Sequence, residues 1–285
     1  MSVTEWTISL PGGRVVGWHE AGAPEGRPLL WCHGGLSSSA EVVFLDAAAR
    51  AAGVRVIALD RPGVGRSPLW DMGPVSRWSE VVAACADLLG FTRFAVAGWS
   101  AGGPFALACG RHLSDRLDSV TLVASMCPVS DPARRKELGL RTDRVLLPLS
   151  VRHPGVAKLV LEPYRWIPRS LLWRGTLATA GEADRRALTP SVRAPVTAML
   201  RQAVAHGVGG VVADYARVGS DWGFPLSDVD MPVSLLQGSA DGMVPPAHAE
   251  VLRALLPAAT LRVIPGAGHF LPITHGAEII DSVCG

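Results

Sequence analysis

The 285-residue chain has 48% hydrophobic and 18% charged residues, which is typical of a globular protein and excludes a disordered one. Its formal net charge of +2 gives no indication of nucleic-acid binding. The opening residues lack the basic and apolar regions of a secretory signal, and no run of about 18 apolar residues predicts a membrane-spanning helix. The five cysteines occur singly, and an odd count without a signal peptide favours reduced thiols. We therefore expect a cytoplasmic protein that does not associate with membranes or nucleic acid.

The first half of the chain alternates strand-like and helix-like segments. Two segments flanking Pro11-Gly12-Gly13 predict an opening β-hairpin: "TEWTISL" and "RVVGWHEAG". Four later runs are rich in strand-forming residues: "PLLWCHGG", "VRVIALDRPG", "RFAVAGWS" and "LDSVTLVAS". Helices are expected between these runs, at about 40–52, 76–89 and 101–112. The alternation is typical of βαβ crossovers and of a mostly parallel sheet flanked by helices.

This alternation stops at about residue 131 and resumes after 225. Prolines recur between these positions, and we expect each proline to begin or end a short helix. The alternation returns with the strands "PVSLLQGSAD" and "ATLRVIPGAGH" and with helices near 246–256 and 272–283. The sequence thus predicts an α/β core formed by 1–130 and 226–285, interrupted by a helical insertion at 131–225.

A serine between small residues is the first candidate for chemistry. In "AVAGWSAGG", Ser100 ends a predicted strand and begins a helix, which is the context that the pattern G-x-S-x-G requires. Small neighbours let the chain turn sharply enough to expose the hydroxyl of Ser100 as a nucleophile. The alternative is an ordinary turn serine.

Two further polar residues follow predicted strands, where reactive groups collect in parallel sheets. Asp241 follows "PVSLLQG", and His269 comes after the last predicted strand, in a loop that Gly266 and Gly268 allow to bend back. A carboxylate here can hold a histidine in the tautomer that a base needs. Taken singly, Asp241 could be a turn residue and His269 a surface histidine. Together with Ser100 they appear in one of the known orders of a Ser-Asp-His triad.

Backbone N–H groups are expected to form an oxyanion hole beside this triad. The N–H of Ala101 directly follows the serine at the start of a helix. We expect the second donor in the loop after "PLLWC" and choose Gly35, with Leu36 as the neighbouring alternative. No metal-binding H-E-x-x-H motif and no Gly-Lys phosphate loop is present, so neither a metal nor a cofactor is expected.

Five segments resemble the landmark segments of the α/β-hydrolase family: "WCHGGLSSS", "ALDRPGVGRS", "VAGWSAGG", "QGSADGMVP" and "PGAGHF". They lie in the order of that family and cover the chain from about 28 to 270. The resemblance implies that 131–225 is a helical cap inserted after strand six. Some members of the family take their acid from after strand six, which leaves Asp131 as a second choice to Asp241.

The resemblance implies a serine hydrolase that forms an acyl-enzyme on a small-molecule substrate with an ester, thioester or lactone bond. Two other classes stay open on the same fold. One is a non-hydrolytic enzyme, such as a lyase, cyclase or perhydrolase, and the other is a non-catalytic small-molecule-binding protein. Dehalogenases and epoxide hydrolases place aspartate where Ser100 stands, which argues against both activities.

The predicted cap differs from the core in charge. Residues 131–225 contain 13 Arg and 2 Lys against 8 Asp and Glu. Such an excess could steer anionic substrates towards the pocket. The alternative is that these cations only cover the outer faces of helices.

Overall fold

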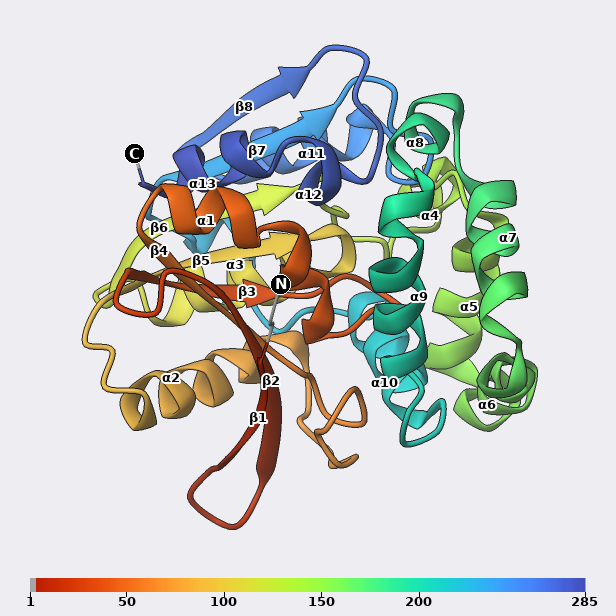
Figure 1. The fold of residues 1–285 in the computed structure, drawn as a ribbon, viewed down its shortest axis with the longest axis horizontal. Helices are drawn as coiled ribbons and strands as arrows, with labels where there is room; N and C mark the ends of the chain where they lie inside the picture. The colour runs from red at the N-terminus through yellow and green to blue at the C-terminus, as the bar shows by residue number, and fades with distance from the viewer. Residues whose placement is uncertain (1–3, 285) are drawn as a thin grey trace.

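The computed structural model describes residues 4–284, so residues 1–3 and Gly285 of the predicted core lie outside it. Within this range, eight strands form one sheet in the order β1-β2-β4-β3-β5-β6-β7-β8 (Figure 1). β2 pairs antiparallel with β1 and β4, and all other pairs are parallel. The strands are β1 (Thr4–Ser9), β2 (Val15–Gly22), β3 (Arg27–Cys32), β4 (Val54–Leu59), β5 (Phe94–Trp99), β6 (Leu117–Val123), β7 (Val233–Gly238) and β8 (Ala259–Ile264). The hairpin and the mostly parallel sheet are as predicted.

Helices follow the strands of the core. They are α1 (Asp46–Ala51), α2 (Trp78–Leu88), α3 (Gly103–His112), α11 (Pro246–Leu255), α12 (Leu271–Thr274) and α13 (Gly276–Cys284). Short 3₁₀ turns precede the first three of these helices: η1 (Ser39–Phe44), η2 (Val75–Arg77) and η3 (Ser100–Gly102). The helices expected at 40–52, 76–89 and 101–112 therefore each begin with a 3₁₀ turn.

The prediction of one helix at 272–283 is wrong in one respect, because two helices, α12 and α13, occupy this segment. His275 separates α12 from α13 with φ −132° and ψ 38°, outside the helical region. The N–H of His275 still closes the last turn of α12 by donating to the carbonyl of Leu271 at 2.7 Å. Gly276, a poor helix former, then begins α13.

The sheet separates two apolar layers, because successive side chains of a strand point to opposite faces. In β4, Ile57 and Leu59 pack into the layer that also contains α2 and α3 residues. Val56 and Ala58 of the same strand pack into the layer that also contains α1 and α13 residues. Both faces are thus covered, as parallel sheets require.

The chain between β6 and β7 is helical. Its elements are α4 (Pro132–Glu137), α5 (Arg141–Arg152), α6 (Pro154–Leu161), η4 (Glu162–Trp166), α7 (Arg169–Thr179), α8 (Glu182–Ala187), η5 (Pro190–Val192), α9 (Arg193–Gln202), α10 (Gly209–Val218) and η6 (Leu226–Asp228). Figure 1 shows α4 to α10 grouped beyond the arrowheads of the parallel strands. This is the edge of the sheet where the predicted site residues lie.

Candidate active site

The turn between β5 and α3 holds Ser100 in a strained conformation. Ser100 has φ 56°, in the left-handed region that residues with a Cβ atom rarely adopt. Such a conformation costs about 1–3 kcal/mol and persists only where the surrounding structure enforces it. The turn is the sharp strand-to-helix bend expected from the sequence.

Glycines beside Ser100 are required by close backbone approaches. A Cβ atom at Gly98 would lie 2.5 Å from the carbonyl oxygen of Gly102. A Cβ atom at Gly102 would collide with the carbonyl oxygen of Cys32 on β3. The small residues thus allow the tight turn that places Ser100 at the end of the sheet.

Asp241 and His269 meet at the same edge. The Nδ1 atom of His269 lies 2.8 Å from Oδ2 of Asp241, and both residues are buried. The backbone N–H groups of Met243 and Val244 each donate to Oδ1 of Asp241 at 2.8 Å. These two bonds orient the carboxylate so that its other oxygen faces the imidazole.

The position of the His269 backbone is fixed by β5. The indole Nε1 of Trp99 donates a hydrogen bond of 3.0 Å to the carbonyl oxygen of His269. The two rings also lie close, with centroids 5.4 Å apart. Trp99 therefore links the end of β5 to the loop that carries the histidine.

The electrostatic surroundings of His269 favour its protonated form. Burial lowers the pKa of the imidazole, but the charge of Asp241 and the hydrogen bond to it act in the opposite direction. Asp184 and Asp143 add smaller contributions, and the net result is a raised pKa for His269. An imidazole in this setting accepts a proton more readily than a free one.

Ser100 and His269 line one cavity of about 360 Å³ between the sheet edge and the helices that follow β6. Most of its wall is apolar. The apolar residues include Leu146, Leu147, Leu172, Met199, Val218 and Phe270. A cavity of this size and polarity suits a small, largely apolar ligand.

The loop after β3 approaches the turn at Ser100. Gly35, Leu36 and Ala101 all line the cavity. A Cβ atom at Gly35 would lie only 3.2 Å from the Cβ of Ala101. Among the described residues, the N–H groups of Gly35 and Leu36 donate no hydrogen bond. Both N–H groups remain available to a ligand. Leu36 has φ 47°, in the left-handed region that non-glycine residues rarely adopt.

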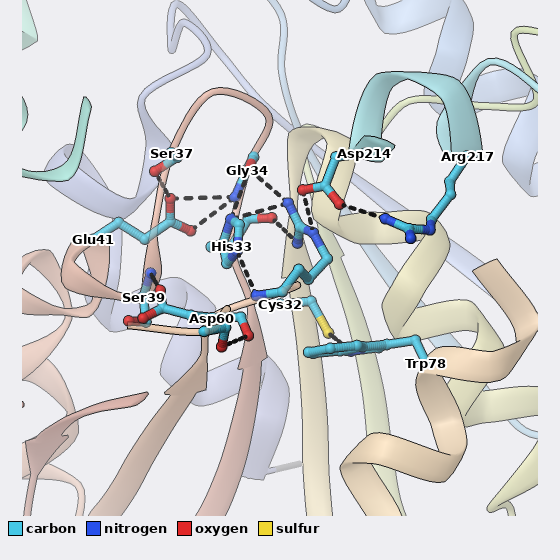
Figure 2. Close-up of polar contacts among 12 residues, drawn as sticks. Cys32, His33, Gly34, Ser37, Ser39, Glu41, Asp60, Trp78, Asp214 and Arg217 are labelled. Carbon is cyan, nitrogen blue, oxygen red and sulfur yellow. Dashed lines mark hydrogen bonds and ion pairs between the residues drawn. The ribbon is translucent and has the colours of Figure 1, made fainter. Parts of the chain in front are cut away.

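A buried carboxylate holds this loop, as Figure 2 shows. Glu41 accepts a hydrogen bond from the indole Nε1 of Trp31 at 2.6 Å and from the N–H of Gly34 at 3.2 Å. The hydroxyl of Ser37 donates to the same carboxylate. Burial raises the pKa of Glu41 to about 7, against the opposing effect of these hydrogen bonds. The contacts fix the backbone of Gly34 directly before Gly35.

A buried arginine supports the same loop from its other side. Arg61 donates to the carbonyl oxygens of His33 at 2.7 Å and Gly34 at 2.9 Å. Its Nε also pairs at 2.7 Å with Asp214 of α10, and Asp214 lies 3.5 Å from Arg217 (Figure 2). The network therefore joins the loop after β3 to the helical segment.

The family of the chain follows from a comparison with known families. The sequence model of the family described as "Alpha/beta hydrolase family" matches residues 29–282 of this chain. The chain belongs to the alpha/beta hydrolase family. The resemblance found in the landmark segments is thereby confirmed, and so is the fold class.

Individual relatives and solved structures share only a minority of their residues with this chain. The chain is 27% identical over 267 residues to a pimeloyl-(acyl-carrier protein) methyl ester esterase of Serratia marcescens, covering 93% of this chain and 95% of that protein. It is 37% identical over 115 residues to the dihydrolipoyllysine-residue acetyltransferase component of the acetoin cleaving system of Pseudomonas putida. That match covers 40% of this chain and spans only 31% of the relative's own length. A thermophilic esterase from Thermogutta terrifontis (malate bound) has a TM-score of 0.69 and 21% identity, covering 99% of this chain and 97% of that one. At this identity, the structural likeness shows the fold alone.

Asp131, the second choice for the acid of the alpha/beta hydrolase site, lies elsewhere. It is the exposed N-cap of α4, where its Oδ1 accepts the N–H of Ala133 at 2.8 Å. The structure therefore brings Asp241, and not Asp131, to the histidine.

Asp184 of α8 belongs to the surroundings of the site, although it lies in no recognisable sequence motif. Its Oδ1 accepts the N–H of Phe270 at 3.1 Å, and the residue is 1% exposed. A Cβ atom at Gly268 would collide with the same carboxylate. Asp184 thus packs against the loop that carries His269.

Residues 4–284 contain neither a metal-binding cluster nor a helix that could cross a membrane. No group of three or more His, Cys, Asp or Glu side chains in this range is arranged to hold a metal ion. No helix within it has the length and hydropathy needed to cross a membrane.

The charged residues of the cavity wall are acidic, whereas residues 131–225 as a whole have an excess of basic residues. No Lys or Arg is among the described residues that line the cavity, whereas Asp143 and Asp214 are. The excess of arginine in 131–225 therefore lies outside the cavity.

Proposed function

We propose that this protein hydrolyses carboxylic esters of small molecules through an acyl-enzyme on Ser100. The observation that carries the proposal is the 2.8 Å hydrogen bond between Asp241 and His269 beside a cavity that Ser100 lines. The esterase among its relatives, aligned over 93% of the chain, supports ester bonds as the substrate class.

In the proposed reaction, the Nε2 atom of His269 takes the proton of the Ser100 hydroxyl as the oxygen attacks the ester carbonyl. Asp241 accepts a hydrogen bond from Nδ1–H of His269 and stabilises the imidazolium that forms. The negative charge on the former carbonyl oxygen is held by the N–H of Ala101 and that of Gly35, with Leu36 as the alternative. The imidazolium returns its proton to the leaving alcohol, and water then releases the acid by the same steps.

The helices between β6 and β7 are proposed to act as a cap, with the chain divided into a core (1–130 and 226–285) and a cap (131–225). Support comes from their position at the carboxyl ends of the strands and from their contribution to the cavity wall. We also propose a cytoplasmic location, which the five free cysteines support.

Hydrolysis of p-nitrophenyl acetate, butyrate and octanoate tests this function. We expect p-nitrophenol and the carboxylic acid in equal amounts, with turnover well above that of buffer alone. If the protein binds these esters without releasing acid, the non-catalytic alternative replaces the proposal. Product formation without uptake of water would favour a non-hydrolytic enzyme.

The pH dependence of kcat/KM tests the assignment of His269 as the base. The neutral imidazole is the active form, so kcat/KM should rise as pH increases through the pKa of His269. Since that pKa is raised, the acidic limb should lie above the ordinary value of 6.5. Replacing Asp184 by Asn removes a nearby negative charge and should move the limb to lower pH.

The exposed Glu182 of the same helix provides a matched control, because Glu182→Gln removes a charge that does not contribute to the pKa of His269. This variant should leave the limb in place. An unchanged limb in Asp184→Asn would show that Asp184 does not act on the base.

A further inference from the structure

A pair of polar side chains in the cavity wall takes no part in the proton transfers of the proposed reaction. The hydroxyl of Tyr215, on α10, donates a hydrogen bond of 2.9 Å to Oδ1 of Asp143, on α5. Both residues line the cavity, and they are 8% and 7% exposed. The pair lies in a wall that is otherwise mostly apolar.

Asp143 does not act as a helix cap. It stands in the first turn of α5, but no side chain caps that helix. The only hydrogen bond that Asp143 accepts within residues 4–284 is the one from Tyr215. Its second carboxylate oxygen makes no hydrogen bond with a described residue and is not fully buried. This oxygen is therefore open to the cavity that Asp143 lines. One oxygen is therefore held by the protein and the other is free for a ligand.

The charge of Asp143 is not neutralised by the protein. Asp214, the other carboxylate of the cavity, pairs with Arg61 at 2.7 Å and with Arg217 at 3.5 Å. No Lys or Arg in the described chain lies within ion-pair distance of Asp143. Burial raises the pKa of Asp143 to about 6, against the opposing effect of the hydrogen bond from Tyr215. A buried carboxylate without a cation is costly, and a positively charged ligand group would offset that cost.

The pair also lies close to the proposed chemistry. A Cβ atom at Gly35 would be 3.9 Å from the hydroxyl of Tyr215 and 3.2 Å from the Cβ of Ala101. The charge of Asp143 contributes to the raised pKa of His269, which places the two groups near each other. Ser100 and Asp143 line the same cavity, so an ester held at Ser100 shares that cavity with the carboxylate of Asp143.

We propose that Asp143, oriented by Tyr215, binds a hydrogen-bond-donating substituent of the ester substrate, and an ammonium group in preference to a hydroxyl. The inference rests on the proposed esterase function and names the substrate class of that site. It concerns the charge of the cavity wall, whereas the two alternatives for the basic residues of 131–225, steering of anions or coverage of outer helix faces, concern residues that do not line the cavity.

Three rigid methyl esters of equal shape test this inference: methyl 4-(aminomethyl)benzoate, methyl 4-(hydroxymethyl)benzoate and methyl 4-ethylbenzoate. The para substituent cannot contact the ester group of the same molecule. Differences in kcat/KM between the three esters therefore arise from contacts with the enzyme. We expect kcat/KM for the ammonium ester to exceed that for the ethyl ester by about tenfold or more, since hydrogen bonds to charged groups are the stronger class. The hydroxyl ester should lie between them.

At a pH where His269 is neutral in both proteins, Asp143→Asn should reduce the ratio of ammonium to ethyl ester by about tenfold. Asp131→Asn, which removes an exposed carboxylate from the same segment, should leave the ratio unchanged. Equal rates for the three esters in the wild type would overturn the inference. So would an equal loss for all three esters in Asp143→Asn, because that pattern indicates a purely structural role.

A binding measurement on the wild-type protein needs no variant and no turnover. By calorimetry, benzylammonium should bind more tightly than benzyl alcohol, by about tenfold. Equal affinities would overturn the assignment of Asp143. Failure of the proposed esterase function gives a different result, because none of the three esters would then be hydrolysed. The binding comparison would still show whether Asp143 prefers an ammonium group.

Discussion

Replacing Ser100 by alanine is expected to lower kcat for ester hydrolysis by roughly 10⁴–10⁶-fold, because the variant has no nucleophile to carry the acyl group. Steady-state kinetics with p-nitrophenyl butyrate would measure the loss. Ser150→Ala is the matched control, since Ser150 is a buried serine whose hydroxyl has no hydrogen-bond partner among the described residues. It should retain wild-type kcat. Activity of Ser100→Ala above about one hundredth of the wild type would contradict the role of Ser100.

The same substitution should leave the fold as stable as before or slightly more stable. The hydroxyl of Ser100 donates no hydrogen bond to any described residue, and alanine fits the same space. The backbone strain at φ 56° is common to both residues. We expect the free energy of unfolding to change by no more than about 0.5 kcal/mol, measured by urea denaturation. Lost activity in a protein of unchanged stability then reports chemistry and not unfolding.

Asp241→Asn should lower kcat by roughly 10⁴-fold, because the substitution favours the wrong tautomer of His269. The N–H groups of Met243 and Val244 occupy Oδ1 of Asp241, so an asparagine must keep its oxygen there. Its amide NH₂ then faces Nδ1 of the imidazole and donates to it. The proton of the ring is consequently held on Nε2, which can no longer act as a base.

Asp131→Asn is the control for this loss, since both substitutions remove one carboxylate by an isosteric change. It should reduce kcat by less than about threefold, because Asp131 caps α4 and pairs with the neighbouring Arg134, and such contacts affect local stability. A larger loss in Asp131→Asn than in Asp241→Asn would reverse the assignment of the acid.

The positions of Ser100, Asp241 and His269 could be predicted because each follows a strand whose sequence is easily recognised. Parallel strands end at one edge of the sheet, so residues that follow them converge there whatever the details of the loops. The 2.8 Å bond between Asp241 and His269 agrees with that expectation. The roles of these residues stay a prediction until the experiments above are made.

Asp184 and Asp143 could not be predicted in the same way. Both come from short helices in a segment without motifs, where local sequence does not determine which helix lies against which loop. Asp184 reaches Phe270 across 86 residues of sequence, and Tyr215 reaches Asp143 across 72. Such contacts depend on tertiary packing of the helices, and a charged residue in an amphipathic helix is ordinarily solvated. The interruption at His275 could not be predicted either, because the apolar pattern of the sequence continues on both sides of it.

Labelling with a fluorophosphonate probe followed by peptide mapping tests the central claim most directly, because the probe reacts only with an activated nucleophile. We expect a single adduct on the peptide that contains Ser100, with labelling abolished in Ser100→Ala and strongly slowed in His269→Ala. An adduct on another residue, or no adduct in the folded wild-type protein, would contradict the assignment of Ser100 as the nucleophile of this site.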